Sequence, residues 1–350
     1  MGDIWETLLV KQVTAKGGIL VGTSISHYKV TEKIGEEGMG KSRRKGHNKR
    51  LPMKLIAAVL KTLALGLLLG WVVPVEAQDL EVTLLGTGTP SPSVDRFGPS
   101  ILVRAGTDWF LFDCGRGTAQ RLFQIGVPLS EVTALFLTHL HSDHTVGFPD
   151  FWLRGWQVGR RKVPLQVWGP EGTTEMMEHL PRAYQADIEF RLSGGRFSPE
   201  GVIIRAQDIA EGPAYEKNGV QVTAFNVDHG YVKPALGYRI DYGGHSVVLS
   251  GDTLPSENLV RFSKGVDLLV HEVRMRDTPT RLHTTPEQAG EIFTRVNPKM
   301  AVYSHTSTPV ARSEELVAST RKTYGGPLEV GEDLMTIEVG EEIRVRRFKP

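Results

Sequence analysis

The chain has 350 residues, an apolar content of 40% and a formal net charge of +1. This length allows one large domain or two ordinary ones, and the composition is that of a globular protein with a hydrophobic core. The near-neutral charge excludes a strong overall attraction to nucleic acid or to anionic membranes. Cys114 is the single cysteine, so an intrachain disulfide is excluded, and its position beside a glycine-rich turn favours a small core residue over a nucleophile.

The first 52 residues differ from the rest of the chain. Residues 27–40 resemble the glycine-rich loop that opens a protein kinase domain, but Glu37 stands where the second glycine belongs. A basic run follows in place of a strand with a phosphate-binding lysine, and neither H-R-D nor D-F-G occurs later in the sequence. We therefore interpret residues 1–52 as a disordered extension with a kinase-like fragment that has no kinase activity.

Residues 53–77 have the layout of a secretory signal peptide. Lys54 gives a positive start, residues 55–73 are largely apolar, and small residues stand at alternate positions before Gln78. The alternative is an uncleaved membrane anchor, because the apolar run approaches the length that spans a bilayer. Both interpretations predict that the catalytic part is exported, either periplasmic or secreted, with membrane contact only through this segment.

From Leu80 onward, short apolar runs alternate with turn signals. Strands are expected at residues 80–85, 101–103, 109–112, 134–137, 163–167 and 220–225, and a hairpin is expected from 235–240 and 246–249. Helices are expected at residues 119–125 and 171–180. Aromatic residues recur at helical spacing in residues 148–156 and are interpreted as core or pocket wall. The pattern does not place the strands and turns of residues 191–219.

The most informative stretch is residues 138–144, Thr-His-Leu-His-Ser-Asp-His, which follows a predicted buried strand. His139 and His141 alternate, so an extended backbone can aim both at one ion. Asp143 and His144 come too soon after them to join the same site easily, and they indicate a second ion. Because imidazole nitrogen and carboxylate oxygen suit zinc and other borderline metals, the run favours a metal site over a polar surface loop.

The pattern H-x-H-x-D-H resembles the signature of the metallo-β-lactamase superfamily of dinuclear hydrolases. Residues 84–90 (LLGTGTP) and 111–118 (LFDCGRGT) precede it in the order of the ribonuclease Z-like branch, and the resemblance runs from about Leu80 to the C-terminus. It implies an α+β fold, a four-layer αβ/βα sandwich, for a hydrolase domain at residues 78–350 with its metals at one edge of the two sheets.

Three later residues follow predicted strands and match ligand positions of this family, namely His229, Asp252 and His305. The resemblance implies two ions with one bridging carboxylate. One ion is held by His139, His141 and His229, the other by Asp143, His144 and His305, and Asp252 bridges both. Two Zn²⁺ are expected, although such sites also accept manganese or iron. Asp143 would in addition orient the attacking water.

A leaving group needs a proton, and two segments resemble the family loops that handle it. Residues 282–285 resemble an H-S-T loop in which Thr284 replaces the serine, and residues 271–274 resemble an H-E-A-T loop that departs from the pattern after its second position. By this resemblance His283 is the general acid and Glu272 fixes its ring. His271 is interpreted as a buried structural histidine.

The prediction of a substrate rests on the surroundings of this site. Transfer-RNA-processing members of the branch carry a long arm, whereas here only residues 241–245 separate the two hairpin strands, and residues 78–350 contain no basic run. We therefore predict a dinuclear zinc hydrolase of small phosphodiesters or aryl sulfates, with metal-activated water as nucleophile and no nucleic-acid partner. The alternatives are a ribonuclease Z-type endonuclease, a lactonase or other carbonyl hydrolase, and a non-catalytic metal-binding module. A homodimer is also expected, because relatives are often dimers.

Overall fold

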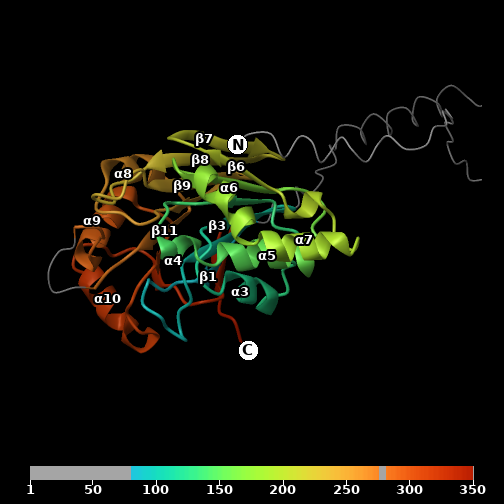
Figure 1. Ribbon diagram of the computed structural model, residues 1–350. Helices are drawn as coiled ribbons and strands as arrows, with labels where there is room; N and C mark the ends of the chain where they lie inside the picture. Colours follow the sequence, from blue (N-terminus) through green and yellow to red (C-terminus); the bar gives the residue numbers. More distant parts are fainter. Residues whose placement is uncertain (1–79, 276–280, 350) are drawn as a thin grey trace, which may run out of the picture. The chain divides into compact units, whose positions relative to one another are not determined.

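The computed structural model describes residues 80–275 and 281–349. The predicted kinase-like extension and the predicted signal peptide lie outside the described residues. Within the described ranges, no helix is long and apolar enough to cross a membrane. The described residues form two β-sheets with helices on their outer sides (Figure 1).

The first sheet has eight strands in the order β15-β14-β1-β2-β3-β4-β5-β6. Neighbours from β15 to β3 are antiparallel, and neighbours from β3 to β6 are parallel. The strands are β1 (Leu80–Gly86), β2 (Ser100–Ala105), β3 (Asp108–Phe112), β4 (Ala134–Phe136), β5 (Leu165–Gly169), β6 (Ile204–Asp208), β14 (Met335–Val339) and β15 (Ile343–Arg346).

The second sheet has seven strands in the order β13-β12-β11-β10-β9-β8-β7. Neighbours from β7 to β10 are antiparallel, and neighbours from β10 to β13 are parallel. The strands are β7 (Gly212–Lys217), β8 (Val220–Asn226), β9 (Leu236–Tyr242), β10 (His245–Leu249), β11 (Leu268–Glu272), β12 (Met300–Ser304) and β13 (Leu328–Val330).

Helices connect the strands and cover the outer faces of both sheets. They are α3 (Thr118–Gln124), α4 (Ser142–Thr145), α5 (Phe148–Gln157), α6 (Thr173–Ala183), α7 (Gln185–Ser193), α8 (Glu257–Ser263), α9 (Pro286–Val296) and α10 (Ser313–Thr320), with the 3-10 turns η1 (Glu200–Val202) and η2 (Val310–Arg312). Figure 1 shows α3, α5 and α7 on one side of the strands and α8, α9 and α10 on the other.

The alternation of side chains along each strand builds three packed cores. Phe110 and Phe112 of β3 point between the two sheets, where they join a core shared with the second sheet, while Leu111 points to the outer helices. On the far side, Leu259 and Phe293 of α8 and α9 pack on the second sheet. The order helix, sheet, sheet, helix confirms the predicted α+β four-layer αβ/βα sandwich.

Most predicted elements are confirmed within a few residues of their bounds. The aromatic run of residues 148–156 lies in α5, where its four rings are almost fully buried in the outer core, as the core interpretation requires. The unplaced segment, residues 191–219, contains the last residues of α7 together with β6 and β7. The helix predicted from residue 171 begins at Thr173 instead, because Gly172 adopts a left-handed conformation and Asp208 accepts hydrogen bonds from the backbone of Gly172 and Thr174.

Phe136 provides a test of the central core. Its ring lies 5.1 Å from that of Phe112 and 5.3 Å from that of Trp168, measured between centroids, and it is fully buried. Phe136→Ala should lower the free energy of unfolding by about 3–5 kcal/mol because it leaves a cavity among these rings. Urea unfolding of the full chain in EDTA measures the change. Phe190→Ala, at an exposed position, is the control and should shift it by less than about 0.5 kcal/mol.

Candidate metal centre

Four strand ends supply the polar residues of the site. In the second sheet β8, β10 and β12 run in the same direction, so their C-terminal ends lie at the same edge. His229, Asp252 and His305 follow these three strands. The fourth contribution comes from the first sheet, where residues 137–141 leave β4 and enter the short helix α4. The antiparallel and parallel pairings therefore bring distant parts of the sequence to one place.

Three histidines form the first group of candidate ligands. One ring nitrogen from each of His139, His141 and His229 lies within 4.8 Å of the others. The ring of His139 is held by Thr138, with 3.0 Å between Nδ1 and Oγ1. His229 Nδ1 donates to the Leu282 carbonyl over 2.8 Å, which leaves the lone pair of His229 Nε2 directed away from that contact.

Asp143, His144 and His305 form the second group, again with ligand atoms within 4.8 Å of one another. Asp143 Oδ2 lies 3.3 Å from His305 Nε2 and 3.6 Å from His144 Nε2. On its other side, His144 Nδ1 donates to Asp113 Oδ2 over 2.7 Å. The two Nε2 atoms therefore face the same carboxylate.

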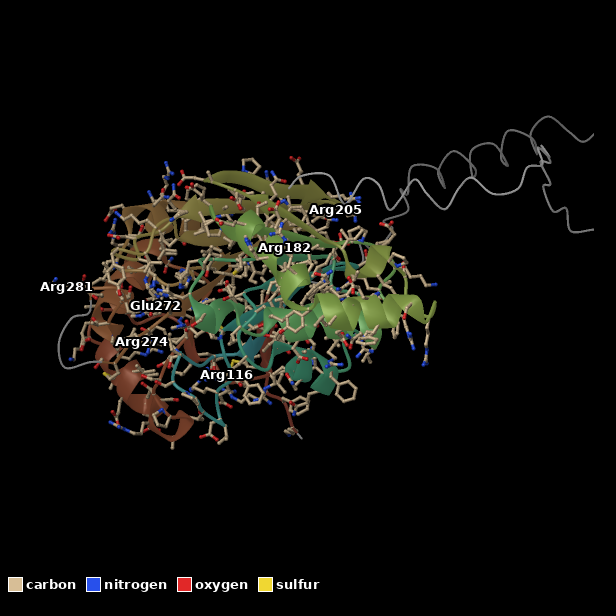
Figure 2. All side chains as sticks on the ribbon, in the orientation of Figure 1. Arg116, Arg182, Arg205, Glu272, Arg274 and Arg281 are labelled. Atoms are coloured by element: carbon tan, nitrogen blue, oxygen red, sulfur yellow. The ribbon has the colours of Figure 1, made fainter. Side chains whose placement is uncertain are left out.

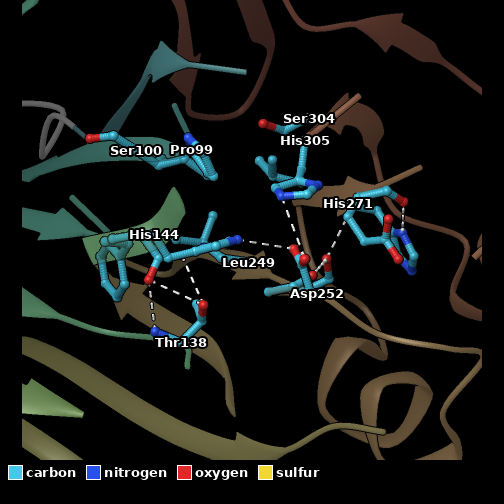
Figure 3. Close-up of a pocket in the computed structure, with 16 residues that line it drawn as sticks. Pro99, Ser100, Thr138, His144, Leu249, Asp252, His271, Ser304 and His305 are labelled. Carbon is cyan, nitrogen blue, oxygen red and sulfur yellow. Dashed lines mark hydrogen bonds and ion pairs between the residues drawn. The ribbon is translucent and has the colours of Figure 1, made fainter. Parts of the chain in front are cut away.

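Asp252 lies between the two groups. Its Oδ1 is 3.5 Å from His144 Nε2, and its Oδ2 is 3.5 Å from His305 Nε2 and 3.9 Å from His229 Nε2. Figure 3 shows Asp252 with His144 on one side and His305 above it, joined to both by dashed lines. This carboxylate thus contacts a histidine of the first group and both histidines of the second.

The charges within the site follow from burial and from these contacts. Burial, together with the neighbouring His144, lowers the pKa of His139 well below its usual range. Burial opposes ionisation of Asp252, but the facing imidazoles of His305 and His144 hold the pKa of this carboxyl group well below its usual range. At neutral pH Asp252 is therefore an ionised carboxylate and His139 a neutral imidazole, which are the forms that ligate metal ions. Burial opposes protonation of His144, but the carboxylates of Asp113 and Asp252 raise its pKa well above the usual range, so its Nε2 must release a proton before it ligates a metal.

Two buried nitrogen atoms test whether these residues fit a metal. Among the described residues, neither His144 Nε2 nor His229 Nε2 has a hydrogen-bond partner, and both are buried. A buried polar atom without a partner is costly, and a cation is the partner that an imidazole lone pair accepts. The nitrogen and carboxylate donors are consistent with a divalent metal such as zinc. The structure thus brings all seven predicted ligands into one cluster.

The predicted general acid, His283, and the residue predicted to fix its ring, Glu272, also meet at this edge. Glu272 ends β11, and its Oε2 lies 3.3 Å from His283 Nδ1. Its other oxygen accepts the backbone N–H of Thr284 over 2.8 Å, which fixes the segment that carries His283. His283 Nδ1 also lies 3.8 Å from Asp252 Oδ2. His271 is fully buried, as its structural interpretation requires.

Asp113 is a site residue whose role the sequence analysis missed. Besides His144 Nδ1, its carboxylate accepts hydrogen bonds from the backbone N–H and the hydroxyl of Thr138, at the start of the histidine run. It adopts φ 58°, a left-handed conformation that Asp and Asn tolerate best among residues with a Cβ. The sequence feature that could have indicated this role is a carboxylate directly after the apolar strand β3.

Asp113→Asn tests the role of the contact between Asp113 and His144. An uncharged amide keeps the volume and the backbone conformation but weakens the acceptor that orients His144. We expect affinity for zinc to fall by about 10–100-fold, measured by competition with a chelating dye. The control is Asp150→Asn on the exposed side of α5, which should bind zinc as the parent does. An unchanged affinity in Asp113→Asn would contradict the assigned role.

Comparisons with known proteins agree with this geometry. The family model described as "Beta-lactamase superfamily domain" matches residues 108–306. Ribonuclease Z of Mycobacterium bovis is 36% identical over 275 residues, which cover 74% of this chain and 98% of the relative. Ribonuclease Z of Mycobacterium tuberculosis is 36% identical over 273 residues with the same coverage.

Solved structures show the same fold. A metallo-β-lactamase fold protein from Bacillus subtilis has a TM-score of 0.62 at 19% identity, covering 74% of this chain and 99% of its own. The short form of human tRNase Z has a TM-score of 0.56 at 23% identity, covering 73% of this chain and 98% of its own. At these identities the similarity supports the fold alone.

The relatives overturn the predicted partner. A small anionic ester with no nucleic-acid partner conflicts with close sequence similarity to proteins named ribonuclease Z, and the aryl sulfate interpretation has no support among them. The short turn between β9 and β10 shows that this chain has no long arm there, but a short turn does not by itself exclude RNA as a partner. The net charge was a poor guide to the partner, because it is summed over the whole chain and does not describe the surface beside the site.

The predicted exported location is overturned as well. The relatives that match nearly over their full length are named for a ribonuclease and not for an exported esterase. Residues 53–77, on which the prediction of a signal peptide or anchor rested, lie outside the described part of the chain.

Proposed function

The chain belongs to the ribonuclease Z family of the metallo-β-lactamase superfamily, and from this premise we propose that it is a metal-dependent endonuclease that hydrolyses phosphodiester bonds in RNA. The observation that carries the proposal is the pair of ligand groups joined by Asp252, with His283 and Glu272 beside them. Precursor transfer RNA is the substrate class to test first, because one structural relative is named tRNase Z.

We assign the ligands to two divalent ions, with zinc as the first choice. His139, His141 and His229 would hold one ion, Asp143, His144 and His305 the other, and Asp252 would contact both. When bound, such a pair of ions activates a water as nucleophile and stabilises the charge of the transferring phosphoryl group. The geometry of Asp252, with its two oxygens directed at different histidines, supports this assignment.

Asp143 would orient the attacking water. Burial opposes its ionisation, but the hydrogen bond with His305 lowers the pKa of the Asp143 carboxyl group, so an acceptor is present at neutral pH. As an ionised carboxylate it can accept a hydrogen bond from the water and hold it in line with the phosphorus. Its position at the start of α4, with its carboxylate within 4.8 Å of the ligand nitrogens of His144 and His305, supports this role.

His283 would give its proton to the leaving ribose oxygen. When the phosphorus–oxygen bond breaks, that oxygen carries negative charge and takes the proton from the imidazole. Glu272 faces Nδ1, so the imidazole is oriented with Nε2 as the donating atom. The side chain of His283 keeps 12% of its surface exposed, whereas its partner Glu272 keeps 2%, so the histidine is the one that a substrate can reach.

Cleavage of RNA by the full chain is the first test. With zinc, the protein should cut a transfer RNA that carries a 3′ extension, because the proposed ligands and the proposed acid lie next to one another. EDTA should abolish cleavage, and added zinc or manganese should restore it. Asp252→Ala, which removes the shared ligand, should fall to the level of a buffer blank. Bound metal without any cleavage of RNA would contradict the proposal and favour a metal-binding module without catalysis.

The acid role of His283 has a separate test. His283→Ala should lower kcat for RNA by about 10²–10⁴-fold, because the ribose oxygen leaves poorly without a proton. An artificial diester with a p-nitrophenolate leaving group needs no such proton, so its kcat should fall far less. His179→Ala, at an exposed position in α6, is the matched control. Equal losses on both substrates would refute the acid role.

A further inference from the structure

The loop that carries His229 presents an exposed tyrosine. In this His229 loop (residues 227–235), His229 is fully buried and Tyr231 is 81% exposed. The turn between them is closed by hydrogen bonds, because Val232 N donates to His229 O over 3.1 Å and Gly230 N donates to Asp228 Oδ1 over 3.0 Å. A well-fixed turn therefore holds an aromatic ring in solvent, two residues from a candidate metal ligand.

Two exposed cationic residues lie on the segments that meet at this turn. Lys233 is exposed on the same loop, and Arg281 is exposed on the segment that leads to His283. The two segments pack closely, since a Cβ added at Gly230 would lie 2.5 Å from Arg281 O and 2.9 Å from a Leu282 side-chain carbon. Figure 2 shows Arg281 projecting outward at the edge of the domain, with Glu272 farther in. The backbone of Arg281, two residues before the proposed acid, therefore packs against the turn that carries Tyr231.

A hollow of about 600 Å³ runs along the same loop. Asn226, Val227 and Asp228 line it from one arm of the loop, Lys233, Pro234 and Ala235 line it from the other, and Glu171 adds a further carboxylate. Its volume lies in the range of pockets that hold small ligands. Carboxylates such as those of Glu171 and Asp228 accept hydrogen bonds from the amino groups of nucleobases.

We propose that the His229 loop binds an unpaired nucleotide of the RNA substrate beside the scissile phosphate. The base stacks on Tyr231, its polar edge or that of the next base enters the hollow, and Lys233 and Arg281 contact backbone phosphates. Unpaired bases are recognised in this way, by stacking on aromatic rings and by hydrogen bonds to their edges. The proposal rests on the proposed function for RNA as substrate, and it adds the residues of this loop that would hold the RNA next to the cleavage site.

Binding measured without cleavage tests this proposal. Fluorescence anisotropy of a short single-stranded oligoribonucleotide with the full chain in EDTA gives Kd independently of catalysis. Tyr231→Ala should weaken binding by about 5- to 150-fold, as expected for loss of one stacked base. Tyr231→Trp should retain the affinity. Phe190→Ala, an exposed aromatic residue on α7, is the matched control and should bind as the parent does.

The salt dependence of binding tests the roles of Lys233 and Arg281. Lys233→Ala and Arg281→Ala should each reduce the slope of log Kd against log salt by about 0.7, as expected for one lost phosphate contact on a single strand. Lys264→Ala, an exposed lysine after α8, is the matched control and should leave the slope unchanged. A blunt RNA duplex should bind more weakly than the same duplex with an unpaired extension.

The outcomes separate this proposal from the proposed function. If the parent binds single-stranded RNA through Tyr231 but never cleaves RNA with zinc bound, the nuclease assignment fails and the loop assignment stands. If the parent binds no single-stranded RNA, or if Tyr231→Ala binds as tightly as the parent, the loop assignment is overturned whatever the cleavage assay gives.

Discussion

A buried carboxylate between two groups of histidines is the constraint on which the site depends. Asp252 is 3% exposed, and imidazole nitrogens of His144, His229 and His305 surround it at 3.5–3.9 Å. An ionised carboxylate in such a place is costly unless opposite charge or a metal lies close to it. The strand ends of two different sheets must therefore meet within a few ångströms, and the sandwich is the arrangement that brings them there.

The candidate ligand side chains are held in turn by groups that lie outside the cluster. Asp113 accepts a hydrogen bond from Nδ1 of His144, and the Leu282 carbonyl accepts one from Nδ1 of His229. Each contact thereby directs the opposite nitrogen, Nε2, into the cluster. Further hydrogen bonds, made by Asp333 and Arg96, join segments from the two ends of the domain near this edge. Asp333 accepts from the backbone of Thr87 and Phe97, and Arg96 donates to the carbonyl of Thr308, three residues after the last candidate ligand.

The predicted substrate was wrong because it was inferred from properties of the whole chain and not from the surface beside the site. A net charge of +1 and a short hairpin turn excluded a strong overall attraction to RNA and a long arm, and neither observation excluded an RNA substrate. Lys233 and Arg281 are two charges among many in the sequence, and only the packing of Gly230 against the Arg281 backbone brings their segments together. Local surface, which composition does not report, is what a nucleic-acid backbone contacts.

Much of the fold and of the candidate site could be derived from the printed sequence. The strand positions follow from apolar periodicity, and the ligand types follow from a compact run of histidines and a carboxylate after β4, because both are local patterns. The contacts that make a site needed the folded domain. His305 meets Asp143 across 162 positions of the chain and Asp113 meets His144 across 31, so no local pattern specifies either pair. Such pairs exist only once the sheets have packed and brought their strand ends to a common edge.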